Sequence, residues 1–198
     1  VFVDTEKILL EVMPVLDHLE KQDIDNIGIL TRIKELKSAL YFRNKRFSEA
    51  KILYEEVYRD KGNINNLISC CIFDGDWDRA IDLLQEKISV ETPNLNDLIT
   101  LSQVYVEAGR PNDALALLEA NKSLVETELK IPLKYYFTYM DALFLNVNHS
   151  EIKNLIEVLN LTTSDREGIY ALKAYYAMKL HDWEEAVTNW ESCIDQLD

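Results

Sequence analysis

Two short stretches place acidic side chains around a tryptophan: Gly75–Ala80 reads GDWDRA and His181–Ala186 reads HDWEEA. Carboxylates at such close spacing can act as a general acid and a general base. The candidates are Asp76, Asp78, Asp182, Glu184 and Glu185. Both stretches stand where an amphipathic pattern begins, and acids at a helix start accept hydrogen bonds from free backbone N–H groups. We therefore interpret these carboxylates as helix-start residues rather than catalytic ones.

The histidines and cysteines form no recognisable metal-binding or nucleophilic motif. No two of His18, His149 and His181 have the spacing that binds a metal from one helix, and the adjacent Cys70 and Cys71 lack the CxxC form. The chain also contains no GxSxG motif and no phosphate-binding glycine loop. We expect a protein that is not an enzyme, with no catalytic residue, no metal and no cofactor.

Composition restricts the classes of partner. The formal net charge is −14 and the isoelectric point is about 4.6, whereas nucleic acids and anionic membranes require a basic surface. No apolar run approaches the roughly 18 residues of a membrane-spanning helix. The three cysteines suggest free thiols and hence a reducing compartment. We expect an acidic, cytoplasmic protein that does not bind nucleic acid and does not insert into a membrane.

The hydrophobic pattern has a helical period throughout, and Gly (5) and Pro (4) are too scarce for a β-rich chain of this length. Pro14 predicts a kink or a helix start within the first segment. Eleven helices are expected, at residues 5–21, 26–43, 47–60, 63–73, 77–88, 95–108, 112–124, 133–146, 149–160, 166–180 and 183–196.

The pattern also repeats at a longer interval. Residues 48–57 (SEAKILYEEV) resemble residues 150–159 (SEIKNLIEVL), and small or aliphatic residues recur at an average of about 34 positions. Those residues are Ala50, Ala80, Ala114, Ile152 and Ala186. A small residue where two helices cross allows their axes to approach to about 8–10 Å. The sequence therefore predicts helix hairpins with close crossings, and irregular units where larger residues replace the small ones, namely Ile68 in the second unit and Met140 and Ile152 in the fourth.

This unit resembles the tetratricopeptide repeat. The resemblance is carried by residues recurring in phase, such as Tyr41, Phe47 and Ala50, then Gly75, Trp77 and Ala80, then Tyr105, Gly109 and Ala114, and finally Trp183, Ala186 and Trp190. It implies an all-α, right-handed superhelix (an α-solenoid) of about five antiparallel helix hairpins, preceded by a helix at about 5–21. The expected single domain covers 1–198, with repeats at about 26–60, 63–90, 95–124, 133–161 and 166–198. The two tryptophans are expected to be anchors wedged at their hairpins.

The resemblance also implies a function. Stacked repeats form a concave groove, and we expect a non-catalytic scaffold or adaptor that binds a protein or peptide there. The groove residues implied by the family are Arg32, Phe42, Arg43, Ser69, Ile72, Phe73, Gln103, Val106, Asp141, Phe144, Tyr175 and Met178. Two alternatives stay open: a ligand-sensing domain of a larger protein, for example a peptide-responsive transcription regulator, and a homo-oligomer formed through the C-terminal repeat, where Trp190 and Cys193 share one stripe.

One segment departs from the acidic composition. Residues 32–51 contain seven cations against Glu35 and Glu49. The cations are Arg32, Lys34, Lys37, Arg43, Lys45, Arg46 and Lys51. This pattern is typical of a solvated helix face, and it is also compatible with a docking patch for an acidic partner segment or another copy of this chain.

Overall fold

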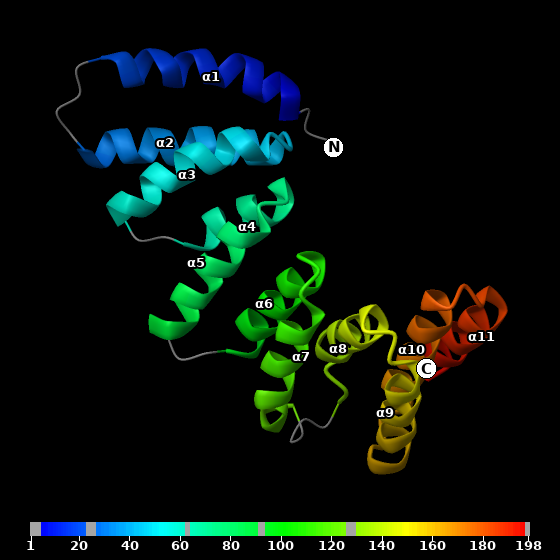
Figure 1. Ribbon diagram of the computed structural model, residues 1–198. Coiled ribbons are helices and arrows are strands. Elements are labelled where there is room, and N and C mark those ends of the chain that lie inside the picture. The colour runs from blue at the N-terminus through cyan, green and yellow to red at the C-terminus, as the bar shows by residue number, and fades with distance from the viewer. Residues whose placement is uncertain (1–4, 23–26, 62–63, 91–93, 126–129, 197–198) are drawn as a thin grey trace. The chain divides into compact units, whose positions relative to one another are not determined.

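A computed structural model describes residues 5–22, 27–61, 64–90, 94–125 and 130–196. These residues form eleven α-helices and one short 3₁₀ turn, with no strand among them (Figure 1). The helices are α1 (Thr5–Lys21), α2 (Ile27–Arg43), α3 (Phe47–Lys61), α4 (Asn65–Asp74), α5 (Trp77–Val90), α6 (Leu95–Glu107), α7 (Pro111–Ala120), α8 (Leu133–Leu145), α9 (His149–Thr162), α10 (Arg166–Lys179) and α11 (Trp183–Ile194), and the 3₁₀ turn η1 is Lys122–Leu124.

The chain divides into two compact units. Unit 1 is Val1–Lys87 and unit 2 is Ile88–Asp198, so the division falls in the last turn of α5. Each unit is built from consecutive antiparallel hairpins, and unit 1 also contains α1 packed on α2. The all-α hairpin architecture expected from the sequence is confirmed, while a single continuous domain over 1–198 stays a prediction.

The turn within each of the five hairpins has the same backbone geometry. A residue with positive φ ends the first helix, and the next residue donates its N–H to a carbonyl five positions earlier, at 2.8–3.0 Å. The positive-φ residues are Lys45, Gly75, Gly109, Val147 and His181. This is the Schellman termination of a helix, and its recurrence at an average of about 34 residues confirms that the five units are in phase.

Most of the expected helix boundaries agree with the structure to within two residues. Pro14 neither begins nor interrupts α1, which continues to Lys21. Pro14 has no backbone N–H, so the Leu10 carbonyl four residues earlier lacks its hydrogen-bond donor within the helix. Both residues are exposed, and water can reach that carbonyl instead. The expected helix 112–124 is shorter, because α7 ends at Ala120 and the chain tightens into the 3₁₀ turn.

Small residues lie buried at the helix crossings, as the sequence predicted. Each is at most 3% exposed: Ser38, Ala50, Ser102, Ala114, Ala174 and Ala186. The two serine hydroxyls donate to carbonyls of their own helices at 2.9 Å, so burial leaves neither hydroxyl unsatisfied. In the fourth hairpin the corresponding positions hold Met140 and Ile152, which are also buried but much larger.

Candidate protein-binding surfaces

The carboxylates of the two tryptophan motifs cap helices. Asp182 accepts a hydrogen bond from the backbone N–H of Glu185 at the start of α11, and Asp76 accepts a longer one from Arg79 at the start of α5. The predicted helix-start role is thus confirmed for these two acids. The anchor role predicted for the tryptophans is wrong for Trp183, which is 58% exposed, whereas Trp77 is half-buried.

The cysteines are packing residues. All three are free and buried, and burial raises the pKa of Cys70 to about 12 and that of Cys71 to about 11. A thiol with such a pKa carries almost no thiolate at neutral pH and is a poor nucleophile. Among the described residues, no group of His, Cys, Asp and Glu side chains is arranged to hold a metal ion.

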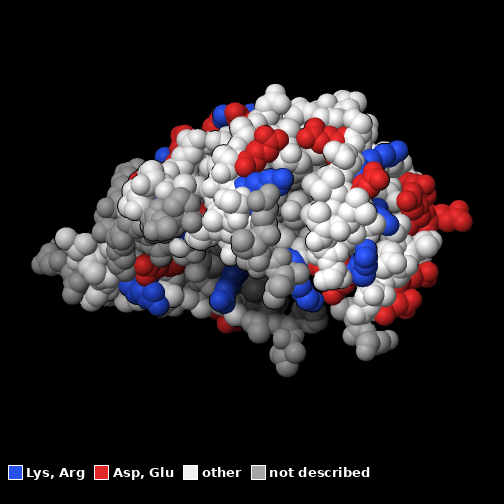
Figure 2. All heavy atoms as spheres, turned by 90° about the horizontal axis from the view of Figure 1, so that it is seen from below, with Lys and Arg blue, Asp and Glu red and all other residues white. Residues whose placement is uncertain are grey.

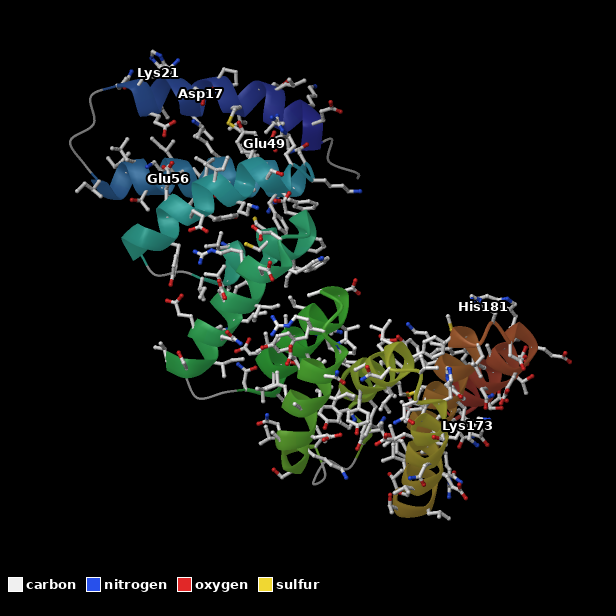
Figure 3. The ribbon with its side chains drawn as sticks, viewed as in Figure 1. Asp17, Lys21, Glu49, Glu56, Lys173 and His181 are labelled. Atoms are coloured by element: carbon white, nitrogen blue, oxygen red, sulfur yellow. The ribbon has the colours of Figure 1, made fainter. Side chains whose placement is uncertain are left out.

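The basic segment 32–51 is largely neutralised within the molecule. Lys34 contacts Glu56 of α3 at 2.7 Å, and Lys51 contacts Asp74 and Asp76 at 2.7 and 2.9 Å (Figure 3 labels Glu56 on α3). Arg32 pairs with Glu35 of its own helix, and Arg46, which precedes α3, pairs with Glu49 of that helix. Lys34 and Lys51 therefore join helices of unit 1, and the docking role of the basic segment stays a prediction.

Lys37 joins the first two helices. Its ammonium group, 10% exposed, donates to Asp17 and Glu20 of α1 at 2.6 and 2.5 Å (Asp17 is labelled in Figure 3). Burial alone would lower the pKa of Lys37, but the hydrogen bonds and charges of the two carboxylates outweigh burial and raise it. A buried lysine that lost both carboxylates would be strongly destabilising, so this cation holds α1 on α2.

Three basic side chains of segment 32–51 line one hollow, among them Arg46, which also pairs with Glu49. It has a volume of about 460 Å³ and lies between the start of α1 and the turn joining α2 to α3. Its lining is Glu6, Leu9, Leu10, Arg43, Asn44, Lys45 and Arg46. Leu10 is 70% exposed, so the hollow, here called the cationic hollow, combines an apolar wall with an excess of positive charge.

An aromatic cluster joins α2, α3 and α4. Phe73 of α4 stacks on Phe47 of α3, with ring centroids 5.1 Å apart, and Phe42 of α2 meets both rings edge-on at 5.3 and 5.6 Å. Phe73 is nevertheless 61% exposed. The structure thus brings together two of the predicted groove residues, Phe42 and Phe73, and adds Phe47, which the sequence assigned only to the repeat framework.

Unit 2 brings two more of the predicted residues together. The Tyr175 hydroxyl donates to Asp141 at 2.7 Å, and Lys179 pairs with the same carboxylate at 2.5 Å. Phe137 stacks on the Tyr175 ring at 4.3 Å. Burial and the hydrogen bond to Asp141 raise the pKa of Tyr175 well above its ordinary value, so the phenol stays protonated as a donor.

The other predicted groove residues are less closely connected. Gln103, Val106 and Phe144 are half-buried on α6 and α8, and Met178 is partly exposed on α10. Ser69 donates to the Asn65 carbonyl of its own helix, and Ile72 is half-buried beside Phe73 in the sequence. Sequence reasoning missed Leu9 and Phe137, because their roles depend on contacts between helices and not on position within a repeat.

The comparisons with known proteins concern the fold. A family model described as PPR repeat matches residues 64–89, which are α4 and most of α5. A solved structure of a tetratricopeptide repeat protein from Parabacteroides merdae is 12% identical, with a TM-score of 0.59, over 96% of this chain and 73% of that one. The chain has a tetratricopeptide-like helical-repeat fold. This confirms the resemblance predicted from the recurring residues.

A structure of the protein MamA, designated MSR-1 C2, is 21% identical over 84% of this chain and 96% of that one, with a TM-score of 0.49. Among curated proteins, none matches the sequence significantly. Within the described part of this repeat protein, no helix is both long and apolar enough to cross a membrane.

Proposed function

We propose that this repeat protein is a scaffold that binds a segment of another protein, and that unit 1 contacts an acidic segment carrying apolar side chains. The observation that carries the proposal is the aromatic cluster of Phe42, Phe47 and the exposed Phe73, together with the cationic hollow lined by residues 43–46, which join Phe42 to Phe47. An aromatic ring such as Phe73 gains free energy when a partner covers it, at about 25 cal/mol for each Å² of apolar surface. The repeat fold supports the general role of a protein-binding scaffold.

Charge supports the choice of an acidic segment. Arg43, Lys45 and Arg46 face the cationic hollow with Glu6 as the single acid in its lining, within a chain whose net charge is −14. A partner carboxylate would be attracted here and repelled by most of the remaining surface. The hollow therefore favours one orientation of an acidic segment, with its apolar side chains placed toward Leu10 and Phe73.

Unit 2 supplies a second contact surface in the proposal. Tyr175, Asp141 and Phe144, together with Gln103, Val106 and Met178, are the predicted groove residues of α6, α8 and α10. Phe137 and Lys179 extend this set through their contacts with Tyr175. The mixture of aromatic rings with one carboxylate and one ammonium group suits a polar, aromatic-containing peptide segment.

The experiment is a selection of random 12-residue peptides displayed on phage against the whole chain. We expect enrichment of sequences that combine Asp or Glu with Leu, Ile or Phe, because such peptides would contact both the cationic hollow and the aromatic cluster of unit 1. Arg43→Glu and Phe73→Ala should each weaken binding of a selected peptide at least tenfold. Lys130→Glu makes the same charge reversal at an exposed cation in unit 2 and should leave binding unchanged. Enrichment of basic peptides, or equal binding by all variants, would overturn the proposal.

Recognition of RNA is the rival function that the matched repeat family raises, since PPR repeats can read one base per repeat. The charge argues against it, because binding to phosphates requires cations and most lysines of segment 32–51 are paired internally. We expect no change in the fluorescence anisotropy of a labelled 15-nucleotide single-stranded RNA at about 150 mM salt. Saturable binding that weakens with added salt would instead support RNA recognition.

We further propose that the protein is non-catalytic and cytoplasmic. The raised pKa values of the buried thiols support the first point, and three free cysteines are compatible with a reducing compartment. Two other roles from the sequence remain as alternatives: a sensory domain of a larger protein, and self-association through the C-terminal repeat. The second alternative concerns the surface of α11.

A further inference from the structure

Helix α11 carries an exposed apolar stripe. Trp183, Val187 and Ile194 are 58%, 55% and 60% exposed, and Trp190 between them is half-buried. Their spacing of four, three and four residues places all of them on one face of a helix. The buried residues of α11, Ala186 and Cys193, lie on an adjacent face that packs on α10. The stripe is therefore additional to the face that holds α11 in the fold.

The stripe is held in place by local contacts. Asp182 caps the helix by accepting from the Glu185 N–H at 3.1 Å, and the indole N–H of Trp190 donates to the Met178 sulfur at 3.4 Å. His181 meets the Trp183 ring edge-on, with centroids 5.7 Å apart. At 1.5 Å rise per residue the stripe extends over about 16 Å, the length of three helical turns. A rigid face of this kind loses little conformational entropy when it is covered.

An acidic border runs along one side of the stripe. Glu184 and Glu191 follow Trp183 and Trp190 in the sequence, and Asp195 follows Ile194, so the three carboxylates share a neighbouring face. No ion pair of these acids is found within the described part of the chain. Figure 2 shows acidic side chains gathered at the end of the view where α10 and α11 lie. The other side of the stripe is closed by α10.

We propose that α11 binds one amphipathic helix of a partner protein, whose apolar seam covers the stripe and whose Lys or Arg side chains lie against the acidic border. The spacing of the stripe is that of positions a and d in a heptad, which favours a helix over an extended strand as the occupant. The acidic border determines the sign of the partner's charge. This surface and its partner are independent of the acidic segment proposed for unit 1.

A second copy of this chain is the disfavoured occupant. In a two-fold antiparallel pair of α11 helices, Glu184 and Glu191 of one copy would face the same residues of the other. Like charges across a helix pair oppose association, and both copies carry a net charge of −14. The homo-oligomer considered from the sequence is thus a competing outcome that experiment can separate from the proposal.

The probe is a synthetic 21-residue helical peptide with Leu at its a and d positions and Lys along one border, tested beside a twin with Glu at those border positions. The Trp77→Phe variant of the whole chain leaves Trp183 and Trp190 as the only tryptophans, so their emission reports directly on the stripe. We expect a blue shift with the Lys peptide and at least tenfold weaker binding of the Glu twin. Equal binding of the twins would overturn the proposal.

Two variants test the surface itself. Val187→Asp should abolish the shift and Glu191→Lys should weaken binding of the Lys peptide at least threefold, while circular dichroism stays unchanged because both side chains are exposed. Leu161→Asp, at a 78% exposed position of α9, is the matched control and should bind normally. Light scattering provides the remaining test. If the unaltered chain dimerises and the Val187→Asp variant is monomeric, a second copy occupies the stripe and the proposal is overturned.

Discussion

The last two hairpins of unit 2 differ in how closely their helices approach. In α10 and α11 the buried crossing residues are Ala174 and Ala186, and the two helices pack along much of their length. In α8 and α9 the corresponding residues are Met140 and Ile152, and the two helices share a far smaller contact. Side chains of that size keep helix axes apart. A repeat can therefore lose its small residues and still fold, but its helices then separate.

The wider hairpin also borders an open space. A hollow of about 390 Å³ lies beside α8, with the C-terminal part of α7 on one side and α9 on the other. Its lining is Glu119, Lys122, Tyr135, Tyr136, Tyr139, Glu151, Asn154, Leu155 and Val158. The Tyr139 hydroxyl donates to Glu119 at 3.0 Å, and buried Tyr135 donates to the Leu118 carbonyl at 2.8 Å. Tyrosines fill part of the gap and satisfy their own hydroxyl groups.

The largest expected effect comes from shortening the side chain that holds the wider hairpin together. Ile152→Ala removes a fully buried side chain from the core around Met140 and Leu172 and should lower the free energy of unfolding by about 2–5 kcal/mol. Urea denaturation measures this decrease in the free energy of unfolding. The control is Leu161→Ala at an exposed site of the same helix, expected to change stability by less than about 0.5 kcal/mol. Equal effects would show that α9 is not held by Ile152.

A smaller effect is expected from the reverse change in the closer hairpin. Ala186→Ile adds three methyl-sized groups where α11 packs on α10 and should cost about 1–3 kcal/mol through overpacking. Thermal unfolding measures the stability of this variant. The control is Thr188→Ile, at an exposed site on α11. If Ala186→Ile were neutral, crossing distance would not be what distinguishes the two hairpins.

The smallest effect concerns the turns. Val147 and His181 end the first helices of the two hairpins at φ of 56° and 60°, a conformation that is costly for a β-branched residue. Val147→Gly should therefore stabilise the protein by about 0.5–1 kcal/mol, after the greater entropy of glycine in the unfolded chain is subtracted. His181→Gly should gain less, because histidine tolerates this region better. A loss of stability in Val147→Gly would show that the valine side chain contributes contacts that outweigh the strain.

Local features of this protein were predictable because they depend on neighbours in the sequence. The period of the apolar residues determined the helices, and the recurring small residues indicated the hairpins and the weak fourth unit. Phe42 and Phe73 were assigned to one surface from their repeat positions, and they do meet. The exposure of Trp183 was not predictable from its likeness to Trp77, because burial depends on whether another helix covers the ring.

The sequence by itself determined the eleven helices, the five turns in phase and the net charge, since each depends on residues close together or on composition. Only the tertiary structure decided which charges remain available to a partner. Lys37 meets Asp17 and Glu20 across two helices, and Lys51 meets Asp74, so cations that read as one basic surface are joined to acids from other segments. The reason is physical: a charge is neutralised by what lies a few ångströms away in space, whatever its distance along the chain.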